Sequence, residues 1–148
     1  MSRLLSILTF IILAFSCKTQ DKAISSNQSK DADILFSLTS TSCMGECPVY
    51  ELLIKTDSTI HFVGKKFTTI KGVASKKLSP SEYTKIITII DEVTWSKLDD
   101  KYNSQMSDLP SFTFKYKNKS VYQYGSEPKS LIKLRKDLLP IIDTKEFF

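Results

Sequence analysis

The sequence predicts an α+β fold, an antiparallel meander sheet with two helices packed on one face, in the order ββββα-ββα. Apolar and polar residues alternate in four successive segments before the first helical pattern, and in two more before the second. Strands that come in runs, rather than in turn with helices, are typical of sheets whose helices lie on one side. Of the 148 residues, 41% are hydrophobic and 25% charged, a composition typical of one globular domain.

The first four strands are expected at residues 34–39, 50–55, 59–63 and 67–75. Short polar segments with the composition of tight turns separate the later strands. The alternation places Tyr50 and Leu52 on the core face of the second strand. It places His61, which lies between Ile60 and Phe62, on the face that points away from the core.

The first helix is expected to begin at Ser79-Pro80-Ser81-Glu82, which combines a capping box with a proline in the first turn. Its apolar stripe is formed by Tyr83, Ile86, Ile87, Ile90 and Val93. These positions recur at helical spacing, so one face of the helix should pack against the sheet.

A hairpin at residues 112–124 and a second helix follow, and Pro140 is expected to end that helix. The stripe of the second helix is formed by Leu131, Leu134 and Leu138. The stretch 94–110 has no regular pattern and is interpreted as mainly loop, with Trp95 and Leu98 packing on the domain. The tail beyond Pro140 is apolar enough that we expect it to dock.

The N-terminus has the pattern of an export signal. Arg3 precedes an apolar run at residues 4–15, and about 12 residues fit a signal peptide but are short for a bilayer span of roughly 20. The following residues, Ala14-Phe15-Ser16-Cys17, resemble the lipobox of bacterial lipoproteins. The resemblance implies cleavage after a signal peptide at residues 1–16 and attachment of lipid to Cys17.

The polar segment 17–33 has no periodic pattern and is predicted to be a flexible, lipid-anchored tether, so residues 34–148 form the single α+β domain. The expected location is the cell envelope, facing the periplasm or the cell surface, with the membrane as partner through the N-terminal lipid. The chain has three cysteines. If Cys17 carries lipid, Cys43 and Cys47 remain as a pair, and an oxidising compartment favours a disulfide between them.

The segment Cys43-Met44-Gly45-Glu46-Cys47-Pro48-Val49-Tyr50 carries the sharpest motif of the chain. We interpret it first as a disulfide clamp between two strands, with Gly45 allowing a sharp bend and Pro48 restricting the backbone before the strand. With the following strand, the motif resembles a bacterial lipoprotein-type family, a domain of unknown function whose signature is Cys-x-Gly-x-Cys-Pro-x-Tyr. The resemblance covers residues 34–139 and implies no activity.

Two alternatives to a clamp remain open for this motif. One is a thiol-redox pair, although a strand follows the motif where thioredoxin-like motifs open a helix. The other is a copper site, because Cys-x3-Cys-Pro also resembles the copper-binding motif of Sco-type copper chaperones. Cys43, Cys47 and His61 would then bind Cu(I), with Met44 nearby. Without this alternative, no cofactor or metal is expected.

Catalytic patterns are scarce in this sequence. It has one histidine, no glycine-rich phosphate loop and no serine in a nucleophile elbow. The sequence therefore favours a non-catalytic binding or structural module over an enzyme, with an envelope protein as a further partner. The formal net charge is +5. Lysines recur along the chain, but the predicted export argues against nucleic acid as their partner. They are either scattered solubilising charge or a cationic face for anionic lipid or an acidic partner.

Overall fold

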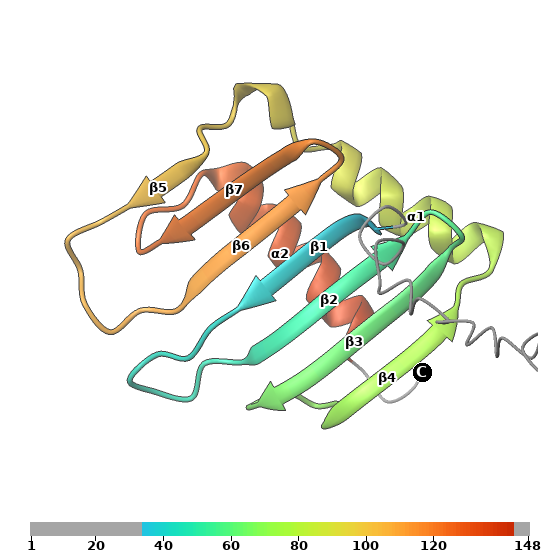
Figure 1. Cartoon of the computed structure of the whole chain (residues 1–148), viewed down its shortest axis with the longest axis horizontal. Coiled ribbons are helices and arrows are strands. Elements are labelled where there is room, and N and C mark those ends of the chain that lie inside the picture. The colour runs from blue at the N-terminus through green and yellow to red at the C-terminus, as the bar shows by residue number, and fades with distance from the viewer. Residues whose placement is uncertain (1–33, 144–148) are drawn as a thin grey trace, which may run out of the picture.

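The computed structural model describes residues 34–143, and Figure 1 shows them as one sheet with two helices behind it. The predicted signal peptide, lipidation site Cys17 and tether lie outside the described residues, as does the end of the predicted apolar tail, residues 144–148. Ile142, which belongs to that tail, is the last residue of the second helix and is buried in the core. Between residues 34 and 143, no helix has both the length and the apolar character that a membrane crossing requires.

Residues 34–143 form seven strands, two α-helices and one short 3-10 helix. In chain order they are β1 (Ile34–Ser40), β2 (Val49–Lys55), β3 (Thr59–Lys66), β4 (Gly72–Lys77), α1 (Pro80–Asp91), η1 (Trp95–Lys97), β5 (Lys101–Asn103), β6 (Ser111–Tyr116), β7 (Lys119–Tyr124) and α2 (Lys129–Ile142). The order of the predicted elements is preserved, and one short strand is added.

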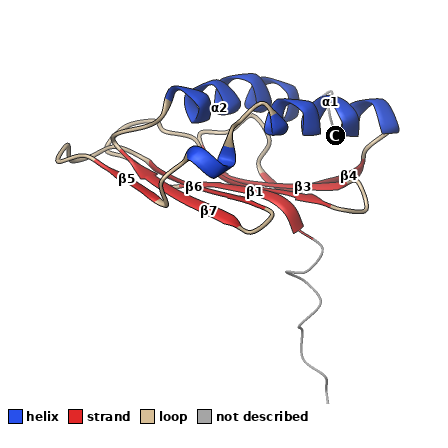
Figure 2. Cartoon of the chain, turned by 90° about the horizontal axis from the view of Figure 1, so that it is seen from above, coloured by secondary structure: helices blue, strands red, loops and turns tan. Residues whose placement is uncertain are grey.

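All seven strands form one sheet in the order β4-β3-β2-β1-β6-β7-β5. Figure 2 shows both helices on the same side of this sheet, as predicted. The predicted meander is only partly correct. β1 to β4 form a meander, but β6 returns to pair with β1, and β5 pairs with β7 in parallel. β1 therefore lies in the middle of the sheet, with β2 on one side and β6 on the other.

Three local expectations differ from the structure. The fourth strand begins at Gly72 rather than Phe67, because Phe67 has a left-handed backbone (φ 54°) that interrupts an extended chain. The stretch predicted as mainly loop contains β5, which pairs with β7 far along the chain and therefore has no local sequence signal. α2 continues through Pro140 to Ile142, since a proline in the last turn removes one backbone donor without breaking the packed face.

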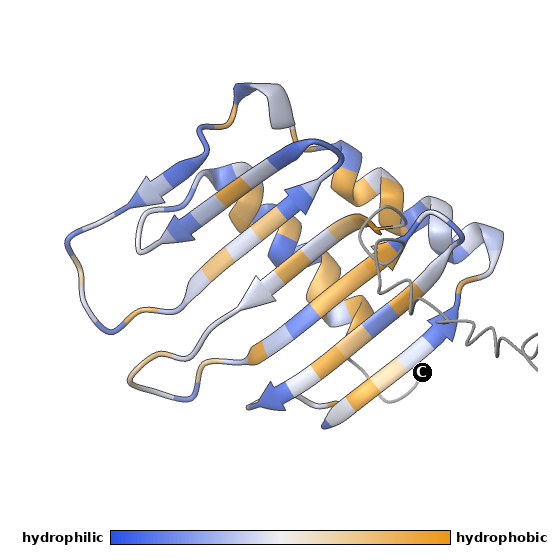
Figure 3. Ribbon diagram, viewed as in Figure 1, coloured by the Kyte–Doolittle hydropathy of each residue, from blue (hydrophilic) through white to orange (hydrophobic). Residues whose placement is uncertain are grey.

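The core lies between the helices and one face of the sheet. Cross-strand partners on this face are apolar, as in the row Ile54–Phe36–Tyr116 and the row Leu52–Leu38–Phe114. Ile86 and Ile90 of α1 and four residues of α2 complete it: Leu131, Leu134, Leu138 and Ile142. Figure 3 shows the hydrophobic and hydrophilic residues alternating along the strands.

Polar contacts hold each helix in its place. Ser79 caps α1 and receives a hydrogen bond from the Glu82 backbone, while the Glu82 carboxylate accepts one from the Ser79 backbone, which confirms the predicted capping box. At the end of α2, Asp143 accepts hydrogen bonds from the backbone N–H groups of Thr69 and Ile70, at 3.2 and 3.0 Å. The loop between β3 and β4 is therefore fastened to the end of α2.

Candidate functional site

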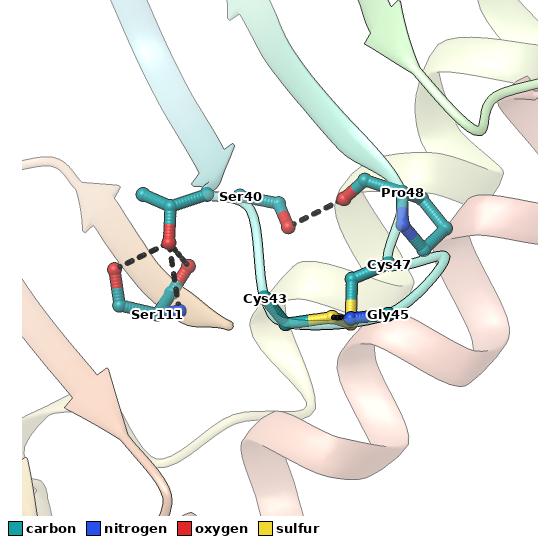
Figure 4. The surroundings of a disulfide bond; sticks show 7 residues. Ser40, Cys43, Gly45, Cys47, Pro48 and Ser111 are labelled. Carbon is teal, nitrogen blue, oxygen red and sulfur yellow. Dashed lines mark hydrogen bonds between the residues drawn. A yellow bond between two sulfur atoms is a disulfide. The ribbon is translucent and has the colours of Figure 1, made fainter. Parts of the chain in front are cut away.

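Cys43 and Cys47 form a disulfide in the loop between β1 and β2, as the sequence predicts (Figure 4). Their Cα atoms are 5.8 Å apart, well within the range for such a bond. Just outside the ring, the Ser40 hydroxyl donates to the Pro48 carbonyl at 2.7 Å, which joins the last residue of β1 to the start of β2. The disulfide therefore links two points of a loop whose ends are already held together by this hydrogen bond.

The disulfide loop is also fastened to the neighbouring loop before β6. The Thr41 N–H donates to the Ser111 carbonyl at 3.0 Å, and the Ser111 N–H donates to the Thr41 hydroxyl at 2.9 Å. The Met44 N–H donates to the Asp108 carbonyl at 3.3 Å. These contacts make the disulfide part of a larger loop cluster at one end of the sheet.

Gly45 does not need to be glycine for steric reasons. Its φ lies outside the left-handed region, and an added Cβ would meet only the Cys43 sulfur, at 3.9 Å. The close approach occurs instead at Gly64, where a Cβ would lie 1.9 Å from the Ile70 carbonyl oxygen. The glycine that close packing requires here is therefore Gly64, which lies against the Ile70 backbone and outside the motif.

Tyr50 lies on the core face, as predicted, and is 1% exposed. Its ring stacks on Phe62, with the ring centroids 5.6 Å apart. Burial raises the pKa of the Tyr50 hydroxyl well above its usual range. The hydroxyl has no hydrogen-bond partner among the described residues, so Tyr50 acts here as a packing residue of the motif.

The structure does not bring His61 to the cysteines. His61 lies on β3 opposite Leu53 and Ser75, on the face away from the helices. The disulfide loop begins after Ser40, which pairs with Tyr50, and Tyr50 pairs in turn with Gly64 of β3. Gly64 is three residues, or about 10 Å along the strand, from His61. Within residues 34–143, no three His, Cys, Asp or Glu side chains are grouped in a way that could hold a metal ion.

The second distinct feature is the face of the sheet that the helices leave uncovered, which we call the open face. Its side chains are Ser37, Thr39, Glu51, Leu53, Lys55, His61, Val63, Lys65, Val73, Lys77, Lys101, Thr113, Lys115 and Tyr122. Two shallow hollows of 330 and 360 Å³ lie on it, and Ile34, Glu51 and Leu53 line both. Val73 beside them is 75% exposed.

The open face carries an excess of positive charge. Its lysines are Lys55, Lys65, Lys77, Lys101 and Lys115, which project from five different strands. The acidic groups near them are Glu51, 4.0 Å from Lys65, and Asp57, 3.4 Å from Lys77. On the helix side, Lys76, Lys133 and Arg135 are instead paired with carboxylates at 2.6 Å.

Sequence reasoning did not predict this face as one surface. The lysines are spread from position 55 to position 115, and only the sheet order brings their strands together. The parity of each position within its strand was the available signal, since alternate residues share a face. To predict one continuous surface from this signal, the pairing of β1 with β6 must also be known, and it joins segments more than 70 residues apart.

The domain described above also corresponds to a known family. No curated protein and no solved structure matches the chain. A family model, "Domain of unknown function (DUF6438)", matches residues 34–142, from the first residue of β1 to the last residue of α2. Since this match covers well over half of the sequence, the chain belongs to that family of unknown function.

Proposed function

We propose that this protein is a lipid-anchored, non-catalytic domain of the cell envelope that binds another envelope component through the open face. The observation that carries the proposal is the sheet itself, which has a helix-covered core on one side and an uncovered face of aliphatic residues and lysines on the other. Uncovered faces with apolar residues and a charged border are typical of interaction surfaces.

The anchor has its own test, which is the mass of the protein extracted from cell membranes. Loss of residues 1–16 and acyl chains on Cys17 are expected. A full-length chain without acyl groups would contradict the anchored location. In that case the arguments from an oxidising compartment would also need another basis.

Binding through the open face is tested by position-specific photo-crosslinking in intact cells. A photoreactive residue replaces Val63 on the open face, and a matched variant carries it at Lys85, which is exposed on α1. We expect one defined adduct from position 63 and none from position 85. Equal labelling from both positions would contradict a specific surface, and turnover of a substrate by the purified protein would contradict a non-catalytic role.

A second candidate function, thiol exchange or copper handling, is favoured by the accessibility of the sulfur atoms. Cys43 and Cys47 are partly exposed, and Met44 between them is 82% exposed. A mild reductant followed by alkylation and mass spectrometry tests it. Release of both thiols under mild conditions, with binding of one Cu(I) per chain to the reduced protein, would support this candidate. A pair that resists reduction would leave only the clamp.

A further inference from the structure

We infer that the open face docks on an anionic phospholipid surface, that of the membrane to which the chain is anchored. The inference rests on the proposed lipid anchor and names the envelope component that the open face contacts. Three observations support it: the charge of the face, its aliphatic patch and the place where the predicted tether joins the domain.

The first observation is electrostatic. Lys55, at the end of β2, and Lys115 of β6 lie on the two strands that flank β1, and neither forms an ion pair within residues 34–143. Lys77 and Lys101 extend the positive charge toward the two edge strands, β4 and β5. A broad surface with several separated lysines matches a layer of anionic headgroups, which presents many negative charges rather than one.

The second observation is the character of the groups between the lysines. Leu53, Val63 and Val73 occupy adjacent strands and form an aliphatic patch over β2, β3 and the edge strand β4. Toward the other edge, Tyr122 is 36% exposed and lies beneath the Lys101 ammonium, 5.9 Å from its ring centroid. Aliphatic side chains, tyrosine rings and long lysine stems suit the boundary between headgroups and acyl chains.

The third observation is geometric. The tether joins the domain at Ile34, the first residue of β1, and Ile34 itself lines both hollows of the open face. A flexible chain as long as segment 17–33 has a root-mean-square reach of roughly 20–25 Å. Seven strands at about 4.8 Å spacing span roughly 29 Å. A tether of this reach, fixed at the border of the face, keeps the face close to the bilayer.

The test measures the reactivity of lysines on the two sides of the domain. Mature protein purified from membranes is reconstituted into phosphatidylcholine vesicles with or without phosphatidylglycerol, and labelled with a water-soluble acylating reagent. Lys55 and Lys115 report on the open face. Lys85 and Lys136, which are exposed on α1 and α2, are the internal control.

We expect Lys55 and Lys115 to react at least about fivefold more slowly when phosphatidylglycerol is present. Each lysine near an anionic surface favours the docked state by about this factor. Lys85 and Lys136 should react equally in both vesicles. High salt should remove the protection, because the screening length falls to about 3 Å at 1 M ionic strength. In a Lys55→Gln/Lys115→Gln variant the protection of Lys101 should weaken, whereas a Lys85→Gln/Lys136→Gln variant should retain it.

Equal labelling of both lysine sets in both vesicles would overturn the inference. So would protection of the open face that does not depend on phosphatidylglycerol, because that outcome would indicate a protein partner or an apolar contact. The mass of the reconstituted protein separates the two hypotheses. A chain without acyl groups contradicts the proposed anchor, whereas an acylated chain with unprotected open-face lysines contradicts only the docking.

Discussion

The two faces of the sheet come from the same strands and have opposite chemistry. Leu52 points to the helices and is fully buried, and its neighbour Leu53 lines the hollows of the open face. β2 and β3 divide their residues in this way, so packing on one side and surface chemistry on the other occupy different positions. In this fold, the packed core and the open face can therefore be changed independently, one residue apart.

The sharpest test of this division replaces each of the two neighbouring leucines separately by alanine. Leu52→Ala removes a fully buried side chain and should lower the free energy of unfolding by about 2–5 kcal/mol. Leu53→Ala should cost less than about 1 kcal/mol, because it only enlarges hollows that are already open to solvent. Equilibrium unfolding in urea measures both values. Similar losses in the two variants would mean that the open face is part of the core.

A second test concerns the glycine of β3 that faces the helices. Gly64→Ala should cost about 1–3 kcal/mol, because the new methyl group meets the Ile70 carbonyl, which Asp143 helps to hold. Gly45→Ala in the disulfide loop is the matched control and should change the unfolding midpoint little. If Gly45→Ala is the more damaging variant, the motif glycine has a role that its backbone conformation does not explain.

The disulfide lies in the loop between β1 and β2, at one end of the sheet. Replacing both Cys43 and Cys47 by serine should lower the free energy of unfolding by about 2 kcal/mol, the loop-entropy value for so small a ring. Wild-type protein kept in reductant should unfold at the same urea concentration as the double variant. A variant as stable as the oxidised protein would remove the structural explanation of the pair and favour a redox role.

The smallest expected effect is the pH dependence of the α1 cap. Hydrogen bonds from the Lys76 ammonium and from Ser79 lower the pKa of Glu82 to about 2, from an ordinary value of 4.5. A carboxylate with a lowered folded-state pKa stabilises the fold above its ordinary pKa, and this contribution is lost as the pH falls from 4.5 toward 2. Glu82→Gln should thus be less stable than wild type at pH 7.

The same variant defines the outcome at low pH. Near pH 2 the urea midpoints of Glu82→Gln and wild type should converge, since the wild-type carboxyl is then losing its charge. A difference that stays constant between pH 7 and pH 2 would show that the Glu82 charge does not support the cap. Thr84→Ala, two residues further along α1, gives a control without a titrating group.

Local patterns predicted most of the elements, and tertiary pairing decided the rest. The alternation around Tyr50 and Leu52, the capping box at Ser79 and the cysteine pair all act within a few residues, so the sequence alone predicted them. The parallel strand β5 has only three residues, and it exists because β7 lies beside it. The central position of β1 depends on β6, which no short-range pattern indicates.

The candidate surface was predictable in part for the same reason. The disulfide needed only the spacing of Cys43 and Cys47, but the collection of Lys55, Lys77 and Lys115 on one side needed the order of the strands. The placement of His61 away from the cysteines needed the register of β3 against β2. At Pro140 the local signal gave the wrong prediction. Proline was expected to end the helix, but α2 continues to Ile142 because Leu138 and Ile142 are packed in the core.

The central position of β1 has a mechanical consequence. A pull on the chain before Ile34 is transmitted directly to a strand that is hydrogen-bonded on both sides, to β2 and to β6. When the load runs along the strand, the bonds of both ladders are sheared together rather than opened one after another. The domain is therefore built to resist tension at its amino-terminal end.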